Sequence, residues 1–123
     1  MNNETGIRDY VGIRKGLDGQ SLGELEAQIL DIIWDLEPPI TAAQVFRVMY
    51  PRRELSYSTV MLTMSKLAKK GLLVQERSGP KKTDAFFYTP VMSREELGRN
   101  LLETVAQQIF HKPLGQVLLD LVR

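Results

Sequence analysis

Apolar residues recur along this chain at two spacings, and the change of spacing divides it into helical and strand-like parts. Between residues 22 and 36, leucine and isoleucine return every three or four positions until Pro38 and Pro39 interrupt the run. This spacing places the apolar side chains on one face of an α-helix. The S-x-x-E pattern of Ser21 and Glu24 is a capping box and predicts where the helix begins.

A second, shorter helix is predicted directly after the two prolines. Thr41 and Gln44 form another capping pair before the run AAQVFRVMY, and Pro51 ends that run. Val45, Val48 and Met49 are its predicted buried side.

A third helix is predicted between Ser56, a suitable N-cap, and Gly71, a suitable C-terminal stop. Its apolar stripe consists of Val60, Met64 and Leu67. The opposite face has small hydroxyl groups near the start and cations towards the end, namely Ser58, Thr59, Ser65, Lys66 and Lys69. This order suits a helix whose first turns meet base edges in the DNA major groove and whose last turn meets phosphate.

After Gly71 the spacing becomes strand-like. The runs LLVQER and AFFYTP flank the polar loop SGPKKTD, and together they predict a β-hairpin. Lys81 and Lys82 make the tip of this hairpin basic, as in a loop that straddles a phosphate backbone.

Two further helices are predicted near the C-terminus. Ser93 and Glu96 form a third capping pair, and Pro113 begins the last helix. A second copy of the chain is the expected cover for their apolar side chains, although folding back onto the same domain is the alternative. The predicted interface consists of Leu97, Leu101, Leu102, Val105, Ile109, Leu114, Val117, Leu118 and Leu121.

Composition fits one globular domain with an appendage: the chain has 123 residues, of which 43% are hydrophobic and 25% charged. We expect a flexible N-terminal arm (1–20), a DNA-binding domain (21–92) and a helical dimerisation region (93–123). The formal net charge of +1 hides a segregation of charge, because residues 41–82 hold nine cations and two anions while residues 22–40 hold five anions and no cation. Such a basic block is typical of a polyanion-binding face, and a solvated basic surface without a partner is the alternative.

Several classes of function find no support in the sequence. The absence of cysteine excludes disulfides, thiolate zinc sites and a cysteine nucleophile. The one histidine, His111, lies at a helix junction where an exposed or capping role is expected, and the anions of the first helix are expected to form a solvated face. We therefore predict no enzyme activity, no cofactor and no metal. The chain lacks a signal peptide and a membrane-spanning run, so a cytoplasmic location without membrane insertion is expected.

Three helices, a basic hairpin and a helical tail correspond to the winged helix-turn-helix plan, mainly α with a small β-hairpin. The segments LGELEAQILDIIWDLEPPITAAQVFRVM, LSYSTVMLTMSKLAKKGLLVQE and FFYTPVMSREEL closely resemble the penicillinase-repressor family of the BlaI/MecI/CopY type. The resemblance runs from about Leu22 to the C-terminus. It implies a homodimeric transcriptional repressor that binds double-stranded DNA at a palindromic operator and dimerises through its tail helices.

The resemblance also implies which residues face DNA. It places Ser58, Thr59, Met61, Leu62, Ser65 and Lys66 on the recognition helix and Lys81 and Lys82 in the wing. With their neighbours, the predicted DNA-binding set is Arg53, Ser56, Tyr57, Ser58, Thr59, Met61, Leu62, Ser65, Lys66, Lys69, Lys81 and Lys82. Leu62 departs from the small polar residue common there in relatives; it either contacts a thymine methyl group or is packed.

Regulation is less well defined by the resemblance. Copper-responsive relatives carry a cysteine motif near the C-terminus, which this chain lacks. Antibiotic-responsive relatives are cleaved inside the dimer helix, which implies a membrane sensor-protease as a further partner. The matching bond here is Asp120-Leu121, where relatives have Asn-Phe.

One hypothesis from another class remains open. A winged-helix domain can also serve as a protein-interaction module, whose basic face would dock on an acidic protein partner. Salt-dependent binding to random duplex DNA would begin to separate the two hypotheses.

Overall fold

The computed structural model describes residues 22–123 and divides them between two compact units. One unit is Leu25–Ser93, and the other contains residues 94–123. The predicted N-terminal arm and the predicted cap Ser21 lie outside the described residues. Within the described part, no helix has the length and apolar character needed to cross a bilayer.

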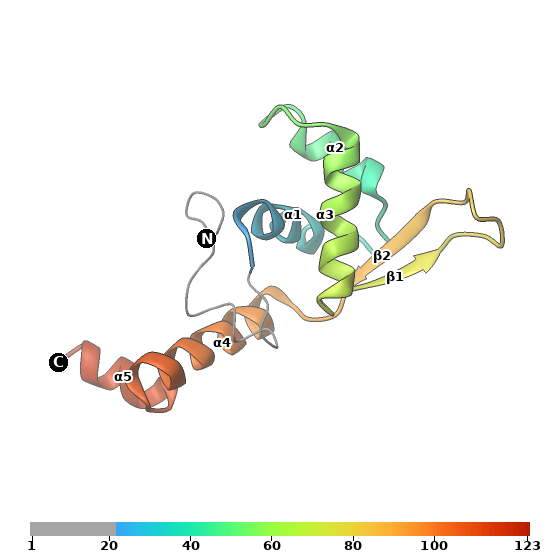
Figure 1. Ribbon diagram of the computed structural model, residues 1–123. Helices are drawn as coiled ribbons and strands as arrows, with labels where there is room; N and C mark the ends of the chain where they lie inside the picture. Colours follow the sequence, from blue (N-terminus) through green and yellow to red (C-terminus); the bar gives the residue numbers. More distant parts are fainter. Residues whose placement is uncertain (1–21) are drawn as a thin grey trace. The chain divides into compact units, whose positions relative to one another are not determined.

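The first unit contains the three helices and the hairpin in the predicted order. These elements are α1 (Glu24–Trp34), α2 (Ala42–Met49), α3 (Tyr57–Lys69), β1 (Leu73–Arg77) and β2 (Phe86–Pro90). Figure 1 shows the helices gathered together and the hairpin extending away from the end of α3. The two faces of α3 differ in exposure: one face packs inward and the other is open to solvent.

The first helix ends earlier than its apolar run indicates. The run continues to Leu36, but α1 stops at Trp34, and the amides of Asp35 and Leu36 donate to carbonyls only three residues back. The prolines that follow disfavour helical backbone in the residue before them, which accounts for the early stop.

Local hydrogen bonds fix the start of α2 as predicted. The Gln44 amide donates to Oγ1 of Thr41 at 3.2 Å, and the Thr41 amide donates to Oε1 of Gln44 at 2.8 Å. The predicted capping box is therefore confirmed.

The core of the first unit comes from the apolar faces of all three helices and from Ile40 in the connection between α1 and α2. Its most deeply buried side chains, each less than 2% exposed, are Ile29, Leu30, Ile33, Ile40, Val45, Val60, Met64 and Leu67. Burial of each such side chain contributes about 1.5–3 kcal/mol. The inward face of α3 supplies three of them, so its outward face is held in a fixed orientation by packing.

A three-residue link joins α3 to the hairpin. Gly71 has φ of +83°, which favours glycine, and its amide donates to the Ala68 carbonyl at 3.0 Å. The Leu72 amide donates to the Leu67 carbonyl at 3.0 Å. These two bonds form a Schellman motif, which ends the helix and sets the direction in which β1 begins.

The hairpin is antiparallel, with Leu73 opposite Pro90 and Arg77 opposite Phe86. A third short segment extends it, because Ile40 exchanges backbone hydrogen bonds of 2.9 and 2.7 Å with Tyr88. The base of the hairpin is thereby tied to the connection between α1 and α2. The sequence pattern did not predict this pairing.

The second unit contains α4 (Arg94–Val105), a π-helical turn η2 (Ala106–Phe110) and α5 (Leu114–Leu121). The sequence predicted a regular helix through Ile109, and the structure corrects this. His111 adopts a left-handed conformation with φ of +58°, and its amide donates to the Ala106 carbonyl, five residues back. The wider turn ends the helix and changes the direction in which the residues after Val105 project.

Candidate nucleic-acid interface

The outward face of α3 is a continuous stripe of exposed and half-buried side chains. At the spacing i, i+3, i+4, i+7, i+8 and i+11, it consists of Ser58, Met61, Leu62, Ser65, Lys66 and Lys69. We call this set the recognition stripe. Its first half is hydroxyl and apolar, and its last turn is cationic, where the negative end of the helix dipole favours cations. All six residues belong to the predicted DNA-binding set.

The start of α3 is held by a hydroxyl network. Oγ of Ser56 accepts a hydrogen bond from the Thr59 amide at 3.1 Å and lies 2.9 Å from Oγ1 of Thr59. Ser56 is thus the N-cap that the sequence predicted. Thr59 is half-buried, and its hydroxyl already contributes to the cap, so it sits at the edge of the recognition stripe.

Tyr57, the first residue of the helix, is exposed, and its ring meets the Phe46 ring edge-on at 5.6 Å. Phe46 also contacts Tyr50, at 5.4 Å between centroids. These ring contacts connect the beginning of α3 to α2, and they leave part of the Tyr57 side chain accessible beside the recognition stripe.

Contacts within the hairpin shape its basic tip. Lys81 and Lys82 are exposed as predicted. The Asp84 carboxylate accepts the Lys81 amide at 2.9 Å, and the Arg77 guanidinium donates to the Lys82 carbonyl at 2.6 Å while lying 4.6 Å from the Phe86 ring centroid. The backbone of both lysines is therefore held while their ammonium groups remain at the surface.

The positions of Arg77 and Asp84 were not singled out from the sequence. The signal was present in part, because an aspartate three residues after Lys81 is common in a tight loop. A Cβ atom on Gly79 would overlap the Asp84 carboxylate, so a larger residue there would displace the Asp84 side chain from its present position.

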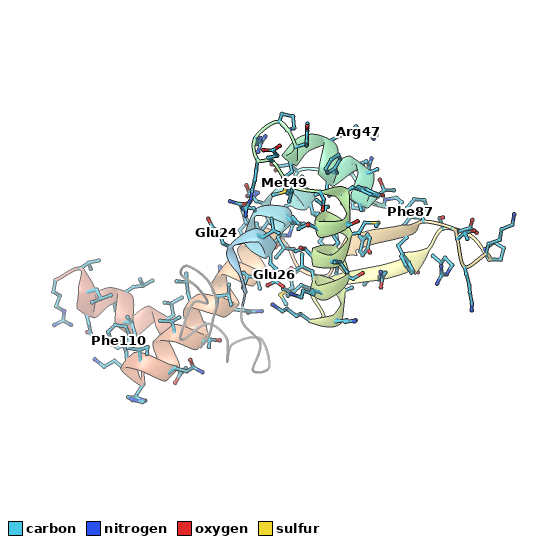
Figure 2. All side chains as sticks on the ribbon, turned by 45° about the horizontal axis from the view of Figure 1, so that its top comes forward. Glu24, Glu26, Arg47, Met49, Phe87 and Phe110 are labelled. Carbon is cyan, nitrogen blue, oxygen red and sulfur yellow. The ribbon has the colours of Figure 1, made fainter. Side chains whose placement is uncertain are left out.

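Not every cation of the basic block is presented to solvent. Lys70, the C-cap of α3, forms an ion pair of 2.5 Å with Glu26 of α1, and their side chains are only 16% and 10% exposed. The prediction that Glu26 belongs to a solvated face is therefore wrong. Its position, labelled in Figure 2, is on the side of α1 that faces α3.

The error came from the charge of Glu26, because helical spacing puts it on the same face as Ile29 and Ile33, but the sequence does not show that Lys70 packs opposite. The other anions of the segment, Glu24, Asp31, Asp35 and Glu37, are exposed as predicted. Arg53 is also engaged, because its guanidinium donates to Oε1 of Gln28 at 2.6 Å. It remains exposed and adjoins the turn before α3.

The predicted dimer residues in the second unit fall into two groups. Leu97 and Val117 are buried within the chain, and Leu101, Val105 and Leu114 are half-buried. Large exposed apolar side chains are found at predicted and at unpredicted positions, namely Leu102, Ile109, Leu118 and Leu121 together with Phe110, Leu119 and Val122. The turn at His111 and the packing of α5 against η2 bring part of this surface together.

The residues at the predicted cleavage bond lie at the end of α5. The Asp120 carboxylate accepts hydrogen bonds from Lys112 at 2.6 Å and Gln116 at 2.9 Å. These contacts, the one from Lys112 above all, lower the pKa of Asp120 below its usual value. The Asp120-Leu121 bond is thus part of an ordered helical turn.

Metal binding and histidine chemistry find no support in the described residues. Among residues 22–123, no three His, Cys, Asp or Glu side chains gather closely enough to hold a metal ion. His111 is exposed at the end of a helix, as its position in the sequence predicted.

Three helices followed by a basic two-stranded hairpin, with the third helix exposed along one face, define a winged helix-turn-helix domain. The predicted fold class is confirmed. Residues 22–123 match the family described as penicillinase repressor, and the chain belongs to that family.

Curated relatives include two proteins named transcriptional regulator BlaI, from Mycobacterium tuberculosis strains CDC 1551 / Oshkosh and ATCC 25618 / H37Rv. Each is 40% identical to this chain over 81 residues, which are 66% of this chain and 56% of the relative. The match therefore covers little more than half the length of these relatives. Both names describe regulators of transcription and not enzymes, in agreement with the prediction that the chain is not an enzyme.

Proposed function

We propose that this chain is a sequence-specific DNA-binding transcriptional repressor that acts as a homodimer on a palindromic operator. The observation that carries the proposal is the recognition stripe, which projects from a helix anchored by its opposite face and ends in Lys66 and Lys69. The width of an α-helix fits the major groove, and the hairpin tip supplies two more cations for phosphate. The relatives named as transcriptional regulators support the same function.

Roles within the interface follow from side-chain chemistry. Ser58 and Ser65 are small donors and acceptors suited to base edges, whereas Lys66, Lys69, Lys81 and Lys82 are suited to phosphate. Ser56, Tyr57, Thr59 and Arg53 border the recognition stripe, where they would position the helix on the backbone. The location we propose for this activity is the cytoplasm.

The homodimer is proposed from the exposed apolar surface of the second unit. Seven large apolar side chains of residues 94–123 are exposed, and exposed apolar surface of this extent is often covered by a second copy. A two-fold dimer would present two recognition helices, which explains why an inverted repeat is the expected operator. Release through cleavage at Asp120-Leu121 by a membrane sensor-protease stays a prediction.

A titration against duplex DNA at several salt concentrations tests the function. If roughly six phosphates are neutralised, affinity should fall about 10³-fold between about 50 and 200 mM salt. Lys66→Ala and Lys81→Ala should weaken binding to operator and random duplex alike, each lowering the salt slope by about one. Ser58→Ala removes a hydroxyl group assigned to base edges, so it should mainly reduce discrimination between operators.

Arg99→Ala is a matched control, because Arg99 is an exposed cation on α4 outside the proposed interface. It should leave affinity for duplex DNA within about twofold. The proposal would be overturned if both lysine variants bound operator and random DNA as the original chain does, or if the chain bound an acidic protein while ignoring duplex DNA at low salt.

A further inference from the structure

The most unusual member of the recognition stripe is a large apolar side chain in the middle of a polar, cationic surface. Leu62 is 67% exposed, the most exposed of the apolar side chains on α3. It is followed along the stripe by Ser65, Lys66 and Lys69. An isolated exposed leucine is common on proteins, so the surroundings decide whether this one has a ligand.

Those surroundings form a shallow depression beside α3. It is lined by Leu25 from α1 and by Thr59, Leu62, Lys66 and Lys69 from α3, among others. The lining therefore combines two leucines with two lysines. A ligand that fits this depression carries negative charge and at least one small apolar group.

The packed alternative for Leu62 is excluded by the geometry of α3. The inward face of the helix consists of Val60, Thr63, Met64 and Leu67, all buried. Leu62 lies on the opposite side, and two thirds of its surface remains uncovered. Its apolar surface must be covered by something outside the described chain if it is to contribute to binding.

We propose that Leu62 determines operator specificity by packing against the C5 methyl group of a thymine in the major groove. This inference rests on the proposed function. Among the base edges exposed in the major groove, the thymine methyl is the one apolar group, and cytosine lacks it. The flanking cations hold the phosphate backbone, and Leu62 reads thymine between them.

The size of the effect follows from one buried methyl group. Burial of a methyl or methylene group contributes about 0.8 kcal/mol, which corresponds to an affinity change of about fourfold. Deoxyuridine differs from thymidine only by this methyl group and pairs with adenine in the same way. Replacing the contacted thymine by deoxyuridine in one half-site should therefore weaken binding about fourfold.

The experiment uses the full chain and an operator recovered by selection from random duplexes. Each thymine is replaced singly by deoxyuridine, and affinity is measured by fluorescence anisotropy. The original chain should lose about fourfold at one thymine per half-site. Leu62→Ala should bind both duplexes equally, whereas Val91→Ala, at an apolar position that is 49% exposed and lies outside the proposed interface, should keep the loss at that thymine.

Two results would overturn the inference: no thymine at which the original chain responds to deoxyuridine, or an unchanged response in Leu62→Ala. The first needs no variant, so a folding defect cannot obscure it. Failure of the proposed function looks different, because the chain would then bind no duplex in a salt-dependent way. Operator binding without any response to deoxyuridine leaves the function standing and rejects only the role of Leu62.

Discussion

At the scale of single residues, the pairing of Glu26 with Lys70 has the clearest energetic meaning. Both side chains are largely buried, and their charged atoms lie 2.5 Å apart. Removing water from two charges is costly, and their mutual attraction offsets this cost only while both are present. The pair holds the end of α3 against the start of α1. Its two residues are 44 positions apart in the sequence.

We predict that Glu26→Gln lowers the free energy of unfolding by about 2–3 kcal/mol, because it leaves the Lys70 charge without its carboxylate in a largely buried place. Urea unfolding followed by circular dichroism would measure this. Glu24→Gln is the control, since Glu24 is exposed on the same helix. Equal stability of the two variants would show that the ion pair makes no net contribution.

The same pair shows what a sequence can and cannot predict. The spacing of apolar residues predicted the buried faces of α1 and α3, and capping residues predicted where α2 and α3 begin. Glu26 lies three, four and seven residues before the buried Ile29, Leu30 and Ile33, so helical spacing places it on the buried face although its charge favours an exposed position. Its burial depends on α3 packing opposite, which is tertiary information.

At the scale of elements, the two strands of the hairpin could be predicted from the sequence, but the backbone pairing at its base could not. Alternating and aromatic residues indicated β1 and β2, and the lysines indicated a basic tip. The bridge between Ile40 and Tyr88 involves a single residue pair, which has no period to detect. The π-turn after Val105 escaped prediction for a similar reason, because its apolar residues fit a regular helix equally well.

The loop of the hairpin allows a test in which charge and geometry oppose each other. Asp84→Ala removes an anion near DNA, so charge alone would strengthen binding. We predict instead a loss of about three- to tenfold, because the backbone at Lys81 loses its hydrogen-bond acceptor and the tip is no longer held. Fluorescence anisotropy with the operator would measure it.

Asp84→Asn is the matched control for the loop. Its amide oxygen can still accept the Lys81 amide, so affinity should equal or exceed that of the original chain. Tighter binding by Asp84→Ala than by Asp84→Asn would show that the charge of Asp84, and not its hydrogen bond, governs the wing.

At the scale of the whole molecule, the two units present different kinds of surface. The first unit carries the recognition stripe and the basic hairpin tip, and the second exposes an apolar surface that includes Leu118 and Leu121. The sequence predicted much of this surface. It missed Phe110, Leu119 and Val122, because the turn at His111 and the short α5 set which side chains point outward.

We predict that replacing Leu118 and Leu121 together by serine converts a dimer to a monomer at micromolar concentration, as measured by sedimentation equilibrium. Each leucine is more than half exposed, so the fold should tolerate the change. Operator affinity should fall at least 10-fold, while weak binding to a single half-site persists. Val91→Ser, at an exposed apolar position in the first unit, should remain dimeric.

A monomeric original chain, or a doubly substituted chain that still dimerises, would contradict the assignment of this surface. The two outcomes differ in meaning. The first would remove the reason to expect an inverted repeat, and the second would move the subunit contact elsewhere on the chain.

The link at Gly71 has a consequence for how such a protein could acquire a new target. Only three residues join α3 to the hairpin, and the left-handed conformation of Gly71 fixes their path, so a change in the direction of one element would also change that of the other. A lineage with this architecture would therefore change its preferred site by exchanging individual side chains on a constant frame. Engineering of altered specificity should likewise replace side chains on α3 and leave Gly71 and its neighbours unchanged.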